Sequence, residues 1–377
     1  MKLRKRGIVV IVLVCIAIVL YFLFPESKQA TLKSFQMRSV WFSYIDLEEF
    51  SYDSQEAFRN DFSQAIDKVS DIYTNNVIVQ VRPFADALYE SDLYPTSQMI
   101  SHSSSLSFDP LTEMIDIVHE KDMTIEAWIN PYRISISEKS YKQFANNSSK
   151  KAWLNDSTKT IHYGQYQFIF NPASSTVRKY IVDGVKEVAQ NYDVDGIHFD
   201  DYFYIQGTHD GTSENERIDN VNMLIQEVYQ SIKQINKDMM FGISPQGNYE
   251  NCINEGADVD TWLSEEGYVD YLMPQIYWTD QYGEDGRTTM FSDRAKLFAS
   301  LKRNNDIDIY AGLAIFNCGE EMELDKGWSS SSSNLASQID VLKQYGYSGY
   351  SLFHYNCLDN EATKAEIDEL LKQHPYS

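Results

Sequence analysis

The sequence predicts an α/β fold, a single (β/α)8 barrel, because short apolar segments alternate with segments of helical periodicity over about 340 residues. A doubly wound parallel sheet is the alternative, but no glycine-rich turn follows the first apolar segment. The predicted strands are residues 37–44, 76–84, 123–131, 194–202, 239–246, 269–278, 307–316 and 347–355. Helical patterns between them cover residues 58–73, 111–121, 176–192, 217–235 and 335–345.

The N-terminus predicts a membrane anchor in front of the barrel. A basic tail (residues 1–6) precedes an apolar segment (7–24), whose length of about 18 residues is the lower limit for spanning a bilayer. No small-x-small cleavage site follows it, so an uncleaved anchor is favoured over a cleaved signal peptide. A polar linker (25–36) then leads into the barrel domain (37–377). By the positive-inside rule the basic tail stays in the cytoplasm, and we expect the barrel outside the cell membrane.

The net charge excludes one class of partner. It is −23 at pH 7, and the rest of the chain is more acidic still because four basic residues lie in the first six positions. Such a surface repels the phosphates of nucleic acids, so we expect no nucleic-acid partner. Beyond the anchor, Cys252, Cys318 and Cys357 show no metal-binding spacing. Cys318 and Cys357 both follow predicted strands, so either one disulfide or free thiols are possible.

Two connections are longer than a barrel needs. Residues 132–175 and 85–108 both follow predicted strands and therefore lie on the carboxyl-terminal face, where barrel active sites form. Long connections without obvious structure of their own are usually functional. Both are rich in aromatic residues: Tyr89, Tyr94, Tyr132, Trp153, Tyr163, Tyr166 and Phe168.

Strand alternation predicts which side chains point into the barrel. Apolar residues at every second position should face the helices and leave the others for the lumen. The predicted inward set is Gln80, Arg82, Glu126, Trp128, Asn130, His198, Asp200, Ser244, Gln246, Met273, Gln275 and Tyr277. Polar groups from five strands therefore converge on one end of one lumen.

The adjacent carboxylates Asp200 and Asp201 end the predicted fourth strand. Burying unpaired charge is costly. If the pair were purely structural, one carboxylate would form a salt bridge, for example with Arg82, and the other would cap a loop. The functional interpretation is that Asp200 faces a substrate. Asp201, of opposite parity, would support it, unless the strand ends at residue 200 and lets Asp201 reach the site as well. Glu126 lies four residues before Asn130 and therefore deeper in the lumen, where a structural role, such as pairing with Arg82, and a catalytic role are both open.

Glycoside hydrolysis fits this pattern, because it needs two carboxyl groups at the scissile bond. The catalytic candidates are Asp200, with Asp201 and Glu126 for the second carboxyl. Aromatic rings suit the apolar faces of sugars, and amide and guanidinium groups suit their hydroxyls. The substrate-binding candidates are Arg82, Asn130, Tyr132, His198, Tyr202, Gln246, Gln275, Tyr277 and Trp278. This chemistry requires no cofactor.

Two other functions remain open. His198 and Asp200 with His162 or His209 could bind a cation, as in a metal-dependent polysaccharide deacetylase, although a lone His-x-Asp is a weak signal. A non-catalytic barrel that only binds glycan would also keep the aromatic cleft. No G-x-S-x-G motif supports a serine hydrolase, and no phosphate-binding loop is present.

At these residues the sequence resembles the bacterial glycosyl-hydrolase-like 10 family of envelope-associated barrel proteins. The segments that carry the resemblance are MRSVWFSY, QVRPFADALYES, WINPYR, FNPASSTVRKYIVDGVKEV, YDVDGIHFDDYFY, GISPQGN and MPQIYW. The resemblance implies a glycosidase that acts on cell-wall polysaccharide, such as peptidoglycan strands stripped of their peptides.

The DGIHFD segment is also similar to the fourth-strand motif of chitinase-type barrels. There an Asp orients the acetamido group of the substrate, and a Glu two positions later is the acid. Asp200 matches that Asp, but Tyr202 stands where the acid would be. The likeness therefore leaves Asp200 as nucleophile or acetamide-orienting group and does not identify the proton donor.

Overall fold

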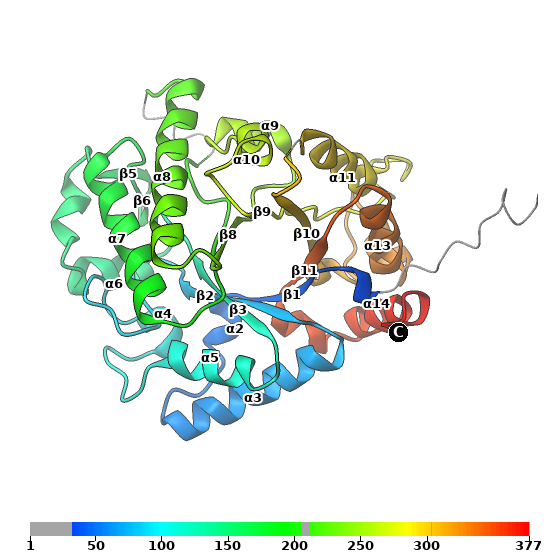
Figure 1. Cartoon of the computed structure of the whole chain (residues 1–377), viewed down its shortest axis with the longest axis horizontal. Coiled ribbons are helices and arrows are strands. Elements are labelled where there is room, and N and C mark those ends of the chain that lie inside the picture. The colour runs from blue at the N-terminus through cyan, green and yellow to red at the C-terminus, as the bar shows by residue number, and fades with distance from the viewer. Residues whose placement is uncertain (1–31, 206–210, 303, 377) are drawn as a thin grey trace, which may run out of the picture.

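The computed structural model describes residues 32–205, 211–302 and 304–376, and within them eight parallel strands close into a barrel (Figure 1). Neighbouring strands follow one another in chain order around it, and β11 pairs with β1 to complete the circle. The barrel strands are β1 (Met37–Phe42), β2 (Asn76–Arg82), β3 (Thr124–Ile129), β7 (Gly196–Phe199), β8 (Met240–Ile243), β9 (Tyr271–Leu272), β10 (Asp308–Ala314) and β11 (Gly349–Phe353). The predicted (β/α)8 barrel is confirmed.

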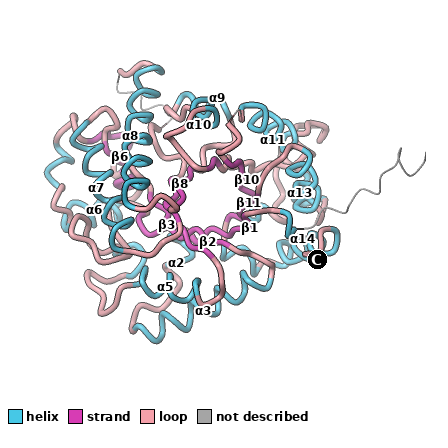
Figure 2. Tube along the Cα trace, in the orientation of Figure 1, coloured by secondary structure: helices cyan, strands magenta, loops and turns pink. Residues whose placement is uncertain are grey.

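Helices form a ring around the barrel (Figure 2). Each connection between successive barrel strands contains at least one of them, and another follows the last strand. The helices of this ring are α3 (Gln55–Asp71), α5 (Pro110–His119), α7 (Ser175–Asn191), α8 (Glu214–Ile235), α9 (Tyr249–Asn254), α10 (Val259–Ser264), α11 (Met290–Leu301), α13 (Asn334–Gln344) and α14 (Glu361–Gln373). Short helices α2 (Tyr44–Leu47), α4 (Gln98–Ser101) and α12 (Gly327–Ser330) lie in connections.

The connection between β3 and α7 has a structure of its own, so the expectation of a loop without structure is wrong. It holds an antiparallel sheet of three strands in the order β4-β6-β5, at the left edge of the molecule in Figure 1. The elements are β4 (Arg133–Ser135), α6 (Glu138–Asn147), β5 (Thr160–Gly164) and β6 (Gln167–Phe170). Aromatic packing stabilises it: the ring of Phe170 contacts those of Phe144 and Trp153 edge-on, at 6.0 and 5.9 Å.

Local signals explain where the helices begin. Asp109 caps α5 by accepting hydrogen bonds from the backbone N–H groups of Leu111 and Thr112, and Pro110 occupies the first position of the helix. Ser213 and Glu216 form a capping box that starts α8 three residues before the predicted boundary.

Two apolar layers hold the barrel together. The larger lies between the strands and the ring of helices. The smaller fills the lumen with Met37, Trp41, Ile78, Trp128, Tyr271, Met273 and Tyr310. Gly242 in β8 makes room for one of them, because a Cβ atom there would come within 1.8 Å of the Tyr271 ring. The lumen is therefore a packed core, and a pocket can open only at its ends.

The predicted anchor (7–24) and basic tail (1–6) lie outside the described residues, as does most of the linker (25–36). Within residues 32–205, 211–302 and 304–376, no helix combines the length and apolar character that crossing a membrane requires. In the same part of the chain Cys252, Cys318 and Cys357 are free thiols, and Cys318 does not bond to Cys357.

Candidate active site

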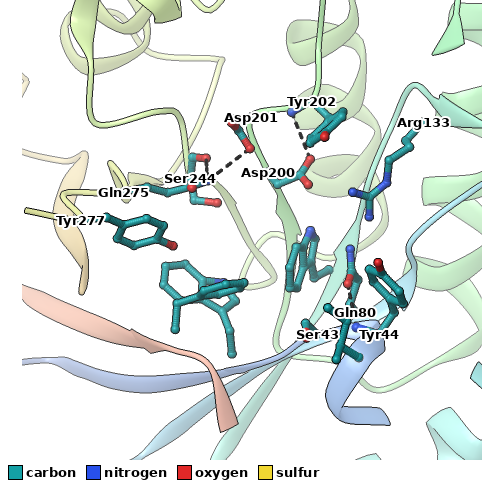
Figure 3. A pocket seen from close by; sticks show the side chains of 14 residues that line it. Ser43, Tyr44, Gln80, Arg133, Asp200, Asp201, Tyr202, Ser244, Gln275 and Tyr277 are labelled. Carbon is teal, nitrogen blue, oxygen red and sulfur yellow. Dashed lines mark hydrogen bonds between the residues drawn. The ribbon is translucent and has the colours of Figure 1, made fainter. Parts of the chain in front are cut away.

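A polar and aromatic pocket of about 170 Å³ opens at the carboxyl ends of the barrel strands (Figure 3). Its aromatic lining comprises Trp41, Tyr44, Trp128, Tyr202, Tyr277 and Phe353. Its polar lining comprises Ser43, Gln80, Arg133, Asp200, Asp201, Ser244 and Gln275. Active sites of (β/α)8 barrels form on this face, so the pocket is the candidate active site.

Asp200 directly follows β7, and its side chain lies in the pocket with 4% of its surface exposed. One carboxyl oxygen accepts a hydrogen bond from the side-chain amide of Asn130. The other accepts from the backbone N–H of Tyr202 at 3.2 Å. Two donors from different connections therefore hold the carboxyl in one orientation.

Asp201 lies in the same pocket, and it also lines a neighbouring cavity together with Tyr202 and Gln246. The side-chain amide of Gln275 donates to Asp201 at 3.3 Å (dashed in Figure 3). Because β7 ends at Phe199, strict alternation stops before Asp201. Both carboxyls consequently line the pocket, as the sequence analysis allowed for a strand that ends by residue 200, whereas strict parity assigns them to opposite sides.

Burial raises the pKa of both carboxyls. Removal from water is the main cause for Asp200 and raises its pKa to about 7; the charge of Arg133 opposes the shift and that of Asp201 adds to it. The pKa of Asp201 is raised mainly by burial, against the effect of its hydrogen bonds. The negative charge of Asp201 disfavours the ionised form of Asp200, so the proton on Asp200 is held more tightly than on an isolated aspartate. The pocket thus holds two carboxyls whose pKa values lie above the ordinary value for aspartate.

Arg133 is the charged residue of the pocket that the sequence interpretation missed. It begins β4, and its guanidinium group points toward Asp200 in Figure 3. Its Nε donates to the carbonyl oxygen of Pro83 at 2.6 Å, and the guanidinium lies over the ring of Tyr202 at 4.9 Å. Its Nη2 is buried without a hydrogen-bond partner. The signals in the sequence were a basic residue two positions beyond a predicted strand and its place at the end of the WINPYR segment.

Glu126 and His198 point into the lumen as predicted, but they lie below the pocket and do not line it. The hydroxyl of Tyr271 donates to Glu126 at 2.6 Å and lies 2.7 Å from Nδ1 of His198. Nε2 of His198 is 2.9 Å from the hydroxyl of Ser244, which does line the pocket. Burial raises the pKa of Glu126 to about 8 and lowers that of His198 to about 3, so both are neutral near pH 7.

Arg82 does not point into the barrel, which corrects the prediction. The pairing of β2 with β3 shifts between Gln80 and Arg82, and this irregularity reverses the alternation. Gln80 faces the pocket, whereas Arg82 donates to the hydroxyl of Tyr94 at 2.5 Å and lies within 2.8 Å of the Cβ position of Gly184 in α7. Arg82 therefore belongs to the packing between barrel and helices, and it pairs with neither Glu126 nor Asp200.

Tyr132 and Trp278 also lie outside the pocket, against prediction. Tyr132 is fully buried in the outer core, with its ring 6.5 Å from that of Phe203. Trp278 is half-buried and packs against Gly247, where a Cβ atom would come within 2.8 Å of the indole. Both residues follow barrel strands, but Trp278 lies beyond the end of β9 at Leu272 and not within a strand as predicted, and the sequence did not predict the direction of either side chain.

The remaining predicted binding residues surround the two carboxyls. Tyr202, Gln275 and Tyr277 line the pocket, and Asn130 lies directly behind Asp200. Gln246 lines the neighbouring cavity, where its amide donates to Glu255 at 2.7 Å. The aromatic wall that the prediction did not assign comes from the first and last strands, with Trp41 in β1 and Phe353 in β11.

The residues considered for a cation site do not come together. His198 is enclosed in the lumen, and the ring of His162 stacks on Phe168 in the inserted sheet. Among the residues that the structure describes, no group of three His, Cys, Asp or Glu side chains is arranged to hold a metal ion. His209 lies outside those residues.

Comparison with known proteins finds similarity to a glycosyl-hydrolase-like family and to proteins named glycosyl hydrolases. The profile of the family described as "Glycosyl hydrolase-like 10" matches residues 36–330. Glycosyl hydrolase YngK of Bacillus subtilis (strain 168) is 27% identical over 383 residues, which cover 91% of this chain and 72% of YngK. Glycosyl hydrolase DigH of Escherichia coli (strain K12) is 27% identical over 388 residues, covering 89% of this chain and 86% of DigH.

Among solved structures, the PgaB (BpsB) glycoside hydrolase domain from Bordetella bronchiseptica is similar to this chain, with a TM-score of 0.59. The two are 11% identical, and the match covers 89% of this chain and 98% of that domain. At this identity the likeness shows a shared fold and says nothing about a shared substrate.

Proposed function

The chain belongs to the glycosyl hydrolase-like 10 family, as the motifs around Asp200 implied, and from that premise we propose that it is a glycoside hydrolase whose catalytic centre is the Asp200–Asp201 pair. The proposed substrate is N-acetylated cell-wall glycan, in particular peptidoglycan strands without peptides. The proposed site of action is outside the cell membrane, to which residues 7–24 would anchor the barrel.

One observation carries the proposal: two titratable carboxyls with raised pKa values share a pocket that is otherwise aromatic and amide-lined. Hydrolysis of a glycosidic bond needs a proton for the departing oxygen and a carboxylate for the oxocarbenium-like transition state. Two carboxyls with raised pKa values can supply both, with one member protonated and the other ionised.

The other groups have roles that follow from their positions. The rings of Trp41, Tyr277 and Phe353 offer apolar faces to a sugar, whose C–H bonds also form apolar faces. The amides of Gln80 and Gln275 and the hydroxyl of Ser43 suit sugar hydroxyl groups.

In the proposed reaction, the protonated member of the pair gives its proton to the glycosidic oxygen as the bond to the anomeric carbon breaks. The ionised member stabilises the positive charge at that carbon, either directly or by orienting the acetamido group of the substrate. A water molecule then adds to the anomeric carbon and returns a proton to the pair. Arg133 keeps one carboxyl ionised, because its positive charge favours the carboxylate.

The substrate assignment rests on the family resemblance. The predicted anchor supports it, because it would hold the barrel next to the cell wall. The strongly acidic composition favours a substrate that is not a polyanion of nucleic-acid type.

The test is cleavage of peptide-free peptidoglycan strands by the purified full chain, followed as new reducing ends. Asp200→Asn should abolish cleavage, because the amide cannot exchange a proton or carry a negative charge. Asp238→Asn is the matched control, since this exposed Asp precedes β8 at the opposite end of the barrel. If wild type and Asp200→Asn bind the strands equally and neither cleaves them, the protein is a glycan-binding barrel instead. If the strands instead lose acetate without new reducing ends, and EDTA stops that release, the deacetylase alternative returns.

A further inference from the structure

The pocket is small for a polymer. At about 170 Å³ it lies below the roughly 300–1,000 Å³ of sites that enclose a whole drug-sized ligand. A glycan strand bound with one sugar beside Asp200 must therefore continue across the surface around the mouth. The side chains at that mouth decide whether the rest of the strand contributes to binding.

Four of the six large exposed hydrophobic side chains in the described part of the chain lie in connections at the same end of the barrel as this mouth. One of the four, Ile45, lines the pocket. Three others, Phe316, Met322 and Leu324, lie in the single connection that follows β10. Exposed apolar groups gathered next to a polar cleft commonly mark a binding surface.

Phe316 extends the aromatic wall of the pocket to solvent. Its ring meets the ring of Tyr277 at 5.4 Å and that of Phe353 at 5.8 Å, edge-on in both cases. Tyr277 and Phe353 stack on each other at 5.9 Å, and both line the pocket. Phe316 itself is 37% exposed and does not line the pocket. The aromatic surface thus runs without interruption from the carboxyl pair out to Phe316.

The backbone holds Phe316 in place. It is the middle residue of a short 3-10 helix (Ile315–Asn317), and both of its neighbours are buried, at 1% and 8% exposure. The carbonyl oxygen of Ile315 accepts a hydrogen bond from the hydroxyl of Thr363 at 3.1 Å. An exposed ring fixed in this way loses little conformational freedom when a ligand stacks on it.

We propose that Phe316 forms a second sugar-binding subsite outside the pocket, which holds a neighbouring sugar of the same glycan strand by stacking on its apolar face. The occupant follows from continuity, because a strand that leaves the pocket along Tyr277 next meets this ring. This inference rests on the proposed glycosidase function. It adds that the protein prefers strands to short saccharides.

Chain length separates this role from simple support of the pocket wall. If Phe316 binds a sugar outside the pocket, Phe316→Ala weakens the binding of those substrates alone that are long enough to reach this ring. We expect KM to rise about 3- to 10-fold for peptide-free glycan strands, in line with the worth of an aromatic contact. Turnover of a fluorogenic aryl glycoside of N-acetylglucosamine should change less than about twofold. Phe316→Trp keeps a platform and should restore the low KM for strands.

Met223→Ala is the matched control, because Met223 is similarly exposed, at 39%, but lies on α8 of the outer ring. Equal losses of activity on strands and on the short glycoside would show that Phe316 only supports the wall, and no loss on strands would also overturn the proposal.

A binding measurement keeps the outcome independent of catalysis. Strand affinity is measured by calorimetry for Asp200→Asn with and without Phe316→Ala. If no variant cleaves any glycan but Phe316→Ala still weakens strand binding 3- to 10-fold, the glycosidase proposal fails and the subsite stands. If strand affinity does not change, the subsite is rejected whatever the activity.

Discussion

Asn130 donates its side-chain amide to the carboxyl of Asp200, which joins the end of β3 to the end of β7 across 70 positions of the chain. The other end of the same amide accepts a hydrogen bond from Gln80 at 2.5 Å. Gln80 in turn accepts from the backbone N–H of Tyr44 at 2.8 Å, after β1. The orientation of Asp200 is therefore fixed by a relay through four neighbouring strands of the barrel.

Asn130→Ala should break this relay. We expect kcat on glycan strands to fall about 10- to 100-fold, since a misplaced catalytic group costs that much. The pKa of Asp200 should also rise, because a hydrogen bond to the charged form is lost. A pH profile of kcat/KM measures both effects. An unchanged profile together with an unchanged kcat would show that Asn130 has no positioning role.

Charge coupling within the carboxyl pair predicts opposite shifts in two variants. Asp201→Asn removes a negative charge that raises the pKa of Asp200, so that pKa should fall. Arg133→Gln removes a positive charge that lowers it, so the pKa should rise. ¹³C NMR of labelled Asp carboxyls follows the titration even where activity is lost. Shifts in the same direction for both variants would refute the electrostatic account.

The sequence could predict the barrel and the position of its chemistry, because both follow from regular patterns. Apolar segments of strand length set the eight strands, and alternation within β7 placed Asp200 in the lumen. The pattern failed where the backbone departs from regularity. The irregularity in β2 turned Arg82 outward. The early end of β7, which the sequence left open, let Asp201 reach the pocket.

Arg133 could not be predicted for a different reason. It sits in an inserted sheet whose position over the barrel depends on packing between aromatic residues far apart in the sequence, such as Phe144 and Phe170. No local periodicity encodes that packing. Phe353 differs, because it ends β11 and the alternation with Tyr350 and Leu352, which face the outer core, turns it toward the lumen.

The two arginines should respond differently to substitution. Arg82→Met removes a buried donor to Tyr94 far from the carboxyls, so we expect a loss of about 1–3 kcal/mol of stability and a kcat within twofold of wild type. Arg133→Gln should instead lower kcat/KM about tenfold or more, because it removes charge next to the reacting groups. Thermal unfolding and steady-state kinetics of both variants give the comparison. A catalytic defect in Arg82→Met without loss of stability would return Arg82 to the site.

The proposed anchor predicts where the protein is found. The full chain should sediment with membranes, resist alkaline extraction, and be cut by protease added outside cells whose membrane is intact. Val14→Lys with Ile18→Lys places two charges in the apolar segment, each costing about 2.5–3.5 kcal/mol at the centre of a membrane helix. That variant should appear in the soluble fraction. Membrane association that survives the double substitution would argue against this segment as the anchor.

Glu126 makes stability depend on pH in a direction that its burial fixes. Its pKa in the folded protein is raised from 4.5 to about 8, so the folded state holds a proton that the unfolded state releases between these values. Stability must then decrease as pH rises through this interval, by up to about 1.4 kcal/mol per pH unit. Gln cannot ionise, so Glu126→Gln should flatten the dependence and be the more stable protein at pH 8. Urea unfolding of the full chain in detergent at pH 5, 6, 7 and 8 measures the slopes. Exposed Glu49→Gln serves as control, and parallel curves for Glu126→Gln and wild type would show that Glu126 ionises normally in the lumen.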